Sequence, residues 1–339
     1  MGALTSASAT SLARLIARRD VTAREAVEAR LRRIEAVDGE VNAVVQLDAE
    51  RAYGGGIETD NPVHGRTSNP DDLARTPGGR SSRAPAACRS PACSTTKGSS
   101  GTLGDPRTQG GPLACSVDDV AGGCGSSPDP TATTVASPRS HWSIRATWTP
   151  AALRVAVRTD NGLGAPTPET VAAVATAAEA LGAAGATMQE ARHPDGGHEL
   201  TIEVWRSYGE GVAAAELWRL LRRWDDFRSR MLAFAARFDV LLCPVFPSPA
   251  RLHGTMNVAG ELDPTSWTTP HSLTGWPAAT VRAGTSAEGL PVDVQLVARP
   301  WRDDVALATA LRVERELGAW APPRGVRRDR PRPARRGTG

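Results

Sequence analysis

The chain has 339 residues, of which 40% are hydrophobic and 23% are charged, and its formal net charge is +3. These proportions are ordinary for a globular protein and exclude a wholly disordered chain, a collagen and a coiled coil. The charge is too small to indicate a nucleic acid partner, and the longest apolar runs fall far short of the ~18 residues that span a membrane. With no secretory signal recognised, we expect a soluble, cytoplasmic protein.

The first 52 residues predict helix. Thr22 and Glu25 have the spacing of a capping box, in which each residue caps the other at a helix N-terminus. Three apolar residues at helical spacing then share one face of this helix: Val27, Leu31 and Ile34. We expect the pair Asp38-Gly39 to end the helix.

The middle of the chain, from about residue 54 to 150, has a different character. Residues 74–102 include no Val, Ile, Leu, Met, Phe, Trp or Tyr, and they are rich in Gly, Pro, Ser and Arg. Such a stretch buries little apolar surface to offset a backbone ordering cost of ~1–2 kcal/mol per residue. We therefore expect it to be irregular, exposed and easily cut by a protease.

After Ala151 the apolar pattern alternates between strand and helix and predicts an α/β fold. The expected strands are Leu153–Val157, Asp239–Val245, Ala279–Ala283 and Val292–Ala298. Thr167-Pro168-Glu169 is a typical helix start, residues 199–238 predict one or two helices, and Asp303 is expected to cap a last helix that ends at Gly318. Together, residues 1–323 are expected to form one domain, and residues 324–339 a basic, disordered tail.

No metal or cofactor is predicted. None of the five cysteines lies in a Cys-x-x-Cys pair, which disfavours a zinc site, and Cys243 lies inside an apolar strand, where a free cysteine usually acts as a small hydrophobic residue. The sequence has no Gly-x-Ser-x-Gly motif, the nucleophile turn with which one of the six histidines would form a Ser-His-Asp triad. There is also no phosphate-binding loop and no dinucleotide fingerprint.

Several segments, in order along the chain, resemble one known family. They are Val21-Thr22-Ala23-Arg24-Glu25, Asn42-Ala43-Val44-Val45, Arg75-Thr76-Pro77-Gly78-Gly79, Gly111-Pro112-Leu113-Ala114, Leu273-Thr274-Gly275-Trp276-Pro277-Ala278, Gly289-Leu290-Pro291-Val292, Gln295-Leu296-Val297-Ala298 and Trp301-Arg302-Asp303-Asp304. This order resembles the amidase signature family over roughly three quarters of the chain.

The resemblance implies an α/β fold with a mixed central sheet flanked by helices, here shortened, and hydrolysis of a small carboxylic amide to acid and amine. The family uses a serine nucleophile, a second serine and a lysine. Serine needs an adjacent base, and a neutral lysine can act as one, whereas arginine stays protonated. Ser81 and Ser82, in the segment that resembles the glycine-serine loop, and Lys97, the sole lysine, are therefore the candidate catalytic residues.

The sequence departs from the family pattern in this same region. The strand that carries the family's lysine is missing between Ala52 and Asn61, Arg80 and Arg83 flank the serines, and the nucleophile motif Gly-Gly-Ser-Ile-Arg is absent. A shifted reading frame and a diverged insert would both explain this. The alternative function is accordingly a catalytically inactive amidase remnant or a partner-binding protein, and the oligomeric state stays open.

Overall fold

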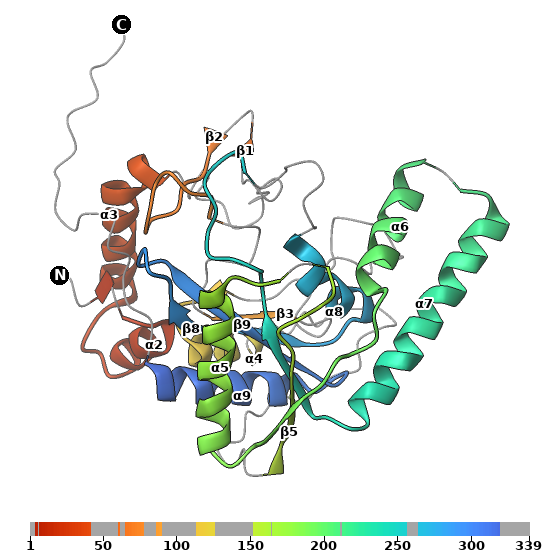
Figure 1. Cartoon of the computed structure of the whole chain (residues 1–339). Coiled ribbons are helices and arrows are strands. Elements are labelled where there is room, and N and C mark those ends of the chain that lie inside the picture. Colours follow the sequence, from red (N-terminus) through yellow and green to blue (C-terminus); the bar gives the residue numbers. More distant parts are fainter. Residues whose placement is uncertain are drawn as a thin grey trace, which may run out of the picture. The chain divides into compact units, whose positions relative to one another are not determined.

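A computed structural model of the chain describes residues 4, 5, 7–41, 60, 61, 65–77, 86–89, 113–125, 152–163, 165–210, 212–255 and 264–318 (Figure 1). The contacts between Cα atoms divide the chain into two compact units. One comprises Met1–Arg83, Ala250–Ala259 and Ala321–Gly339, and the other comprises Ala84–Pro249 and Gly260–Trp320. No helix among the described residues is both long and apolar enough to cross a membrane.

The described part of the first unit includes the helices α2 (Ala9–Ala17) and α3 (Ala23–Val41). The predicted capping box is confirmed: the Thr22 N–H donates to Glu25 Oε2 at 2.8 Å, and the Glu25 N–H donates to Thr22 Oγ1 at 3.2 Å. The predicted end at Asp38-Gly39 is wrong, since α3 continues to Val41. Val41 is buried and its carbonyl accepts the Ser68 N–H at 3.0 Å, and these contacts hold the last turn despite the glycine.

The rest of the described first unit is short strands and loops. Strand β1 (Asp60–Asn61) pairs antiparallel with β2 (Gly65–Arg66). Arg75 ties its loop to a distant part of the chain, because its Nη1 donates to the Ala250 carbonyl at 2.8 Å and its backbone forms a bridge with Leu252. The two segments of this unit are therefore held by backbone pairing as well as by side chains.

The second unit is built on a seven-stranded mixed sheet in the order β4-β3-β8-β9-β7-β5-β6. The strands are β3 (Ala86–Arg89), β4 (Leu113–Ala114), β5 (Arg154–Val157), β6 (Thr187–Glu190), β7 (Val240–Pro244), β8 (Ala278–Thr285) and β9 (Pro291–Ala298). β5 runs parallel to both β6 and β7, whereas the other neighbouring pairs are antiparallel. The mixed central sheet expected from the sequence is confirmed.

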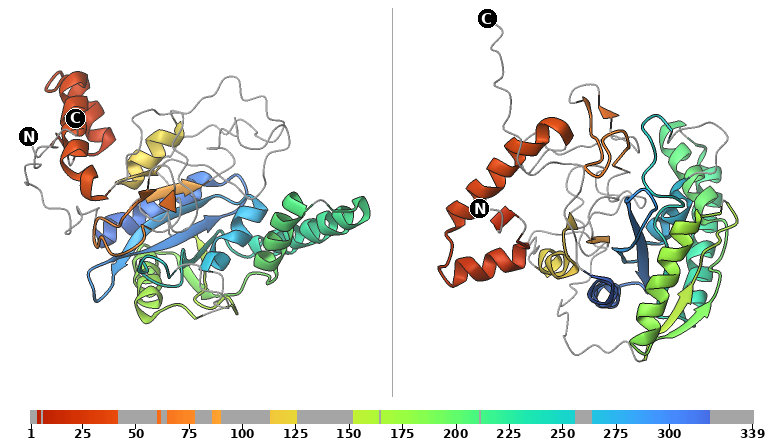
Figure 2. Two further views of the ribbon diagram at one scale, coloured as in Figure 1. Left: turned by 90° about the horizontal axis from the view of Figure 1, so that it is seen from above. Right: turned by 60° about the vertical axis from the view of Figure 1, so that its left-hand side comes forward.

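Helices cover both faces of this sheet (Figures 1 and 2). One face packs against α4 (Val117–Gly125), α5 (Pro168–Ala183) and α9 (Asp303–Leu317), and the other against α6 (Gly197–Glu210), α7 (Ala214–Ala235), the 3-10 turn η2 (Pro264–Trp267) and α8 (Thr269–Thr274). Successive residues of β7 alternate between the two cores, with Leu242 in the first and Leu241 in the second. This alternation explains why β7 reads as a continuous apolar run.

The elements predicted after Ala151 are confirmed, with small shifts of their ends. Helix α5 begins at Pro168 behind the cap position Thr167, and residues 199–238 form the two helices α6 and α7. The expected cap at Asp303 is wrong by one residue: Arg302 holds the non-helical cap position and Asp303 is the first helical residue. A carboxylate in the first turn of a helix is stabilised by the helix dipole, so Asp303 marks the start without capping it.

Several short strands were not expected from the sequence, among them β6 and one in the stretch that lacks large apolar residues. Ala86–Arg89, within the stretch expected to be irregular, forms β3 and pairs with Ala278–Val281 of β8. Strand pairing uses backbone groups, so small side chains suffice when a long neighbouring strand supplies the partners. Residues 78–85 and 90–102 of that stretch and the basic tail lie outside the described residues.

Candidate functional site

The residues named as catalytic from the sequence, Ser81, Ser82 and Lys97, lie outside the described residues. Ser116, another serine near the middle of the chain, is described. Its Oγ accepts the Asp119 N–H at 3.2 Å, at the start of α4. This is a helix-capping contact, which gives Ser116 a structural role.

The topology of the sheet singles out the carboxyl ends of β5 and β7. From β5 the chain crosses through α5 to β6 on one side, and from β6 it returns through α6 and α7 to β7 on the other side. The two crossovers lie on opposite faces. In open α/β sheets, ligands bind outside the carboxyl ends of the strands at such a reversal point.

A buried arginine lies at this point. Arg158 directly follows β5, its side chain is 2% exposed, and its N–H donates to the Leu242 carbonyl at 3.0 Å. Its Nε donates to the Asp160 carbonyl at 2.7 Å, and its Nη2 donates to Asp195 Oδ1 at 2.9 Å. The guanidinium is therefore desolvated but held in one orientation by oxygen acceptors.

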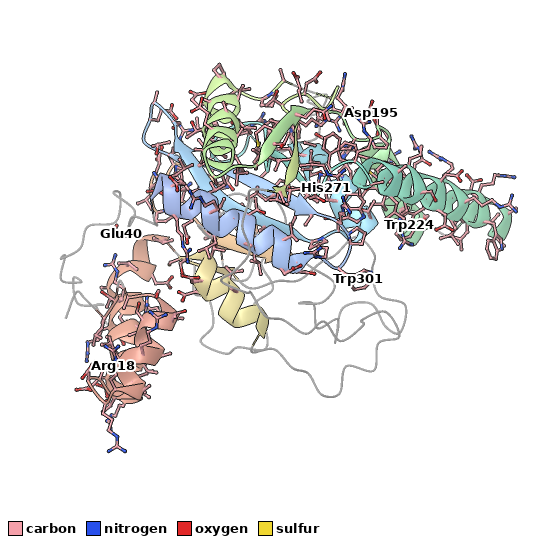
Figure 3. The ribbon with its side chains drawn as sticks, turned by 90° about the horizontal axis from the view of Figure 1, so that it is seen from below. Arg18, Glu40, Asp195, Trp224, His271 and Trp301 are labelled. Atoms are coloured by element: carbon pink, nitrogen blue, oxygen red, sulfur yellow. The ribbon has the colours of Figure 1, made fainter. Side chains whose placement is uncertain are left out.

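Two histidines from different elements pack beside Arg158. The rings of His193, after β6, and His271, in α8, form an edge-to-face pair with centroids 5.2 Å apart. Figure 3 labels His271 and also Asp195, the carboxylate that accepts from Arg158. Burial, and after it the positive charge of Arg158, lowers the pKa of His193 to about 4. Burial also lowers the pKa of His271 well below its ordinary value. Both rings are neutral at neutral pH, and within the described part of the chain neither ring nitrogen of His271 has a hydrogen-bond partner.

Polar residues also form a row across the sheet face beneath α8. Thr280, Gln295 and Cys243 are directly opposite one another on β8, β9 and β7. The Gln295 side-chain amide donates to the Pro244 carbonyl at 2.8 Å and to the Trp267 carbonyl at 2.7 Å. Gln295 therefore fastens η2 to the sheet.

Cys243 is chemically inert in this row. Burial raises the pKa of its thiol to about 12. Because the thiolate is the nucleophilic form, the interpretation of Cys243 as a small hydrophobic residue is confirmed.

Asp293 lies one step further along the same face of β9, opposite Arg282 on β8. Burial raises the pKa of the Asp293 carboxyl to about 7, while Arg282 acts to lower it. A carboxyl with a pKa near neutrality is suited to general acid–base chemistry. Asp293 and Gln295 were not predicted from the sequence. Two polar residues two positions apart in the apolar strand Val292–Ala298 nevertheless indicate a polar patch on one face of the strand.

A hydroxyl–imidazole contact also occurs in this unit. Thr269 Oγ1 and His198 Nδ1 lie 3.0 Å apart, and both residues are buried. The contact joins α6 to α8, so it fixes these helices against each other. Within the described residues, no three His, Cys, Asp or Glu side chains gather as a metal-binding group.

Known proteins resemble this chain in part of its sequence and in its fold. The family model described as Amidase matches residues 202–307. A glutamyl-tRNA(Gln) amidotransferase subunit of Dinoroseobacter shibae is 38% identical over 96 residues, which are 26% of this chain and 19% of that protein. The 6-aminohexanoate-cyclic-dimer hydrolase of Paenarthrobacter ureafaciens is 25% identical over 220 residues, 50% of this chain and 45% of that protein. The chain thus spans about a fifth to about a half of these curated relatives.

Solved structures share the fold. The structure of 6-aminohexanoate cyclic dimer hydrolase complexed with substrate aligns with a TM-score of 0.76 at 20% identity and covers 95% of this chain and 99% of that chain. Fatty acid amide hydrolase aligns with a TM-score of 0.65 at 18% identity, over 77% of this chain and 63% of that chain. The fold and the match on residues 202–307 confirm the resemblance of this chain to the amidase signature family.

Proposed function

We propose that the chain is an amidase-like hydrolase that cleaves a carboxylic amide to acid and amine. The observation that carries the proposal is the Amidase family match on residues 202–307, which run from α6 into α9. The names of two relatives, 6-aminohexanoate-cyclic-dimer hydrolase and fatty acid amide hydrolase, support a small amide as substrate. We also propose that the protein acts in the cytoplasm, on small molecules rather than on nucleic acid or membranes.

We assign the chemistry to Ser81, Ser82 and Lys97. One serine would attack the amide carbon, the second would relay the proton, and the amine of Lys97 would accept it. This route needs no metal or cofactor. Lys97 is the sole lysine, and the 39 arginines cannot replace it as a base because they stay protonated.

The test is an amide hydrolysis assay on the purified full chain. The panel comprises 6-aminohexanoate cyclic dimer and simple aliphatic and aromatic amides, and the readout is release of ammonia or amine. We expect turnover that falls on the order of 10²–10⁴-fold in Lys97→Ala, because a general base is lost. Ser81→Ala and Ser82→Ala should abolish turnover in one case and reduce it in the other. Thr176→Ala, on the exposed side of α5, is the matched control and should keep full activity.

The alternative, a catalytically inactive remnant or partner-binding protein, is favoured by one specific feature. Arg80 and Arg83 place bulky cations on both sides of the candidate serines, where the family has glycines. A folded chain that hydrolyses none of the amides would overturn the proposal and support this alternative. Turnover that survives Lys97→Ala would reject the assigned base while keeping the activity.

A further inference from the structure

One side of α7 carries a stripe of residues that the fold leaves wholly or partly exposed. Its members recur at helical spacing and are here called the α7 stripe: Leu217, Leu221, Asp225, Arg228 and Leu232. Leu217 is 41% exposed and Leu232 is 52% exposed, and the neighbouring Trp218 is 67% exposed. Large apolar side chains gathered on one exposed face of this kind mark interaction surfaces.

The stripe is distinct from the face by which α7 joins its own sheet. That inner face buries Leu220, Phe227, Met231 and Phe234. Arg223 pairs with Glu203 of α6, and the Trp224 ring N–H donates to the Leu273 carbonyl of α8 at 2.9 Å. Figure 1 shows α6 and α7 side by side as a hairpin that projects beyond the sheet. Within the described part of the chain, this hairpin therefore packs through the inner face, and the stripe stays wholly or partly exposed.

The central four residues of the stripe are symmetric in chemistry and spacing. In chain order they are apolar, acidic, basic and apolar, at intervals of four, three and four residues: Leu221, Asp225, Arg228 and Leu232. In the opposite direction along the helix the intervals are again four, three and four, and the acidic and basic residues exchange places. A helix surface of this kind is complementary to itself when a second copy lies antiparallel, because a two-fold axis then brings unlike charges together.

We propose that α7 pairs with α7 of a second copy of this chain around such a two-fold axis. Asp225 then meets Arg228 of the partner subunit, and Leu221 meets Leu232 of the partner subunit. The intervals of four and three residues are those of a coiled-coil seam. Leu217 then lies opposite Ala236 of the partner subunit. The exposed Trp218 flanks the same end of the seam, and aromatic anchors of this kind supply much of the affinity of an interface.

The charges of the stripe are available for this contact. Within one chain, Asp225 Oδ1 and Arg228 Nη1 lie 3.9 Å apart, and the two side chains are 80% and 55% exposed. Such an exposed pair contributes little to the stability of its own helix. Across the two-fold axis the same two residues would form two symmetric ion pairs at the centre of the apolar seam, which fixes the register.

The experiment measures self-association of the full chain by sedimentation velocity across a concentration series. We expect a monomer–dimer equilibrium. Asp225→Arg and Arg228→Asp alone each place like charges together and should raise the dimer dissociation constant at least tenfold. The double reversal Asp225→Arg/Arg228→Asp restores unlike pairs across the axis and should recover most of the affinity. Trp218→Ala should weaken the dimer as strongly as a single reversal.

The matched control is Asp226→Arg. Residue 226 is the exposed neighbour of Asp225, but successive helix residues point ~100° apart, so it faces away from the stripe. This variant should dimerise like the parent. A parent that stays monomeric at all concentrations would overturn the proposal, as would a dimer that ignores both single reversals. Loss of dimer in the double reversal as well would reject this register. Circular dichroism of each variant verifies that α7 is still folded.

Discussion

At the scale of single residues, the second unit holds groups whose charge state is set by burial. His271 is fully enclosed, packs against His193 and lies near the fixed charge of Arg158. Protonating it would place two positive charges together in a dry environment. The folded state therefore keeps His271 neutral, whereas the unfolded chain binds a proton near the ordinary pKa of 6.5.

This difference predicts a pH dependence of stability. A histidine whose pKa is lowered on folding contributes stability that is present above pH 6.5 and is lost as the pH falls below it, at about 1.4 kcal/mol per pH unit. We expect His271→Phe, which keeps the ring shape, to gain stability relative to the parent as the pH drops from 7 to 5. Urea unfolding followed by tryptophan fluorescence measures the difference.

The pH dependence of the parent alone does not isolate His271, because the contribution of Asp293 to stability changes with pH in the opposite direction. Its pKa is raised from 3.8 to about 7, so its contribution weakens as the pH rises through that range. Phe234→Leu is the control, because Phe234 packs against His193 but carries no ionisable group. It should lower the free energy of unfolding equally at both pH values. The same pH slope in His271→Phe and in the parent would contradict the prediction.

Gln295 gives a second prediction at this scale. Gln295→Met keeps the volume of the side chain but removes the donors to the Pro244 and Trp267 carbonyls. We expect a loss of about 1–3 kcal/mol in unfolding free energy for each buried carbonyl left unpaired. Denaturant titration provides the value, and Gln189→Met on the exposed strand β6 is the matched control. Equal stability of both variants would show that these carbonyls are satisfied without Gln295.

Single residues were also the least predictable part of the site. The inertness of Cys243 followed from its apolar strand alone. The row of Thr280, Gln295 and Cys243 could not be predicted in this way. These residues come from three strands, and the register between the strands cannot be derived from a single sequence. The pairing of His193 with His271 likewise joins residues 78 positions apart in the sequence.

At the scale of elements, the junction of α6, α7 and α8 depends on one glycine. A Cβ at Gly197, the first residue of α6, would collide with the Phe227 ring and come within 2.9 Å of Pro270 Cβ. Three elements therefore meet at a point where only a hydrogen fits. The approach is required by packing, because both contacting side chains belong to other helices.

Gly197→Ala should accordingly destabilise the protein by about 1–3 kcal/mol through overpacking. Gly122→Ala is the matched variant, because Gly122 is also helical and a Cβ there meets nothing within 4 Å. It should be neutral or stabilise by about 0.5–1 kcal/mol, since alanine is the better helix former. Thermal unfolding of the two variants measures both effects. A harmless Gly197→Ala would mean that α8 can shift to make room.

Elements were predicted well where the signal is local. The start of α5 followed from Thr167-Pro168-Glu169, and β7 followed from its apolar run. β3 was missed because its stability comes from pairing with β8, which lies almost 200 residues later in the chain. The end of α3 was misplaced for the same reason, since the contacts that hold Val41 come from a distant loop.

At the scale of the whole molecule, the expectation that residues 1–323 form one domain stays a prediction. It rests on apolar periodicity at both ends of the sequence, which we expect to contribute to one core. Differential scanning calorimetry should then show a single transition whose calorimetric and van't Hoff enthalpies agree. Two resolved transitions, one assignable to each compact unit, would contradict it.

The sheet of the second unit has a further consequence at its two ends. β6 has four residues, β4 has two, and each pairs with one neighbour among the described strands. An unpaired strand edge is a template on which other chains can add strands and form aggregates. Short edges limit that growth, and β6 adds mostly exposed side chains that include the charged Glu190. The short edges of this mixed sheet thereby limit edge-to-edge association between copies of the chain.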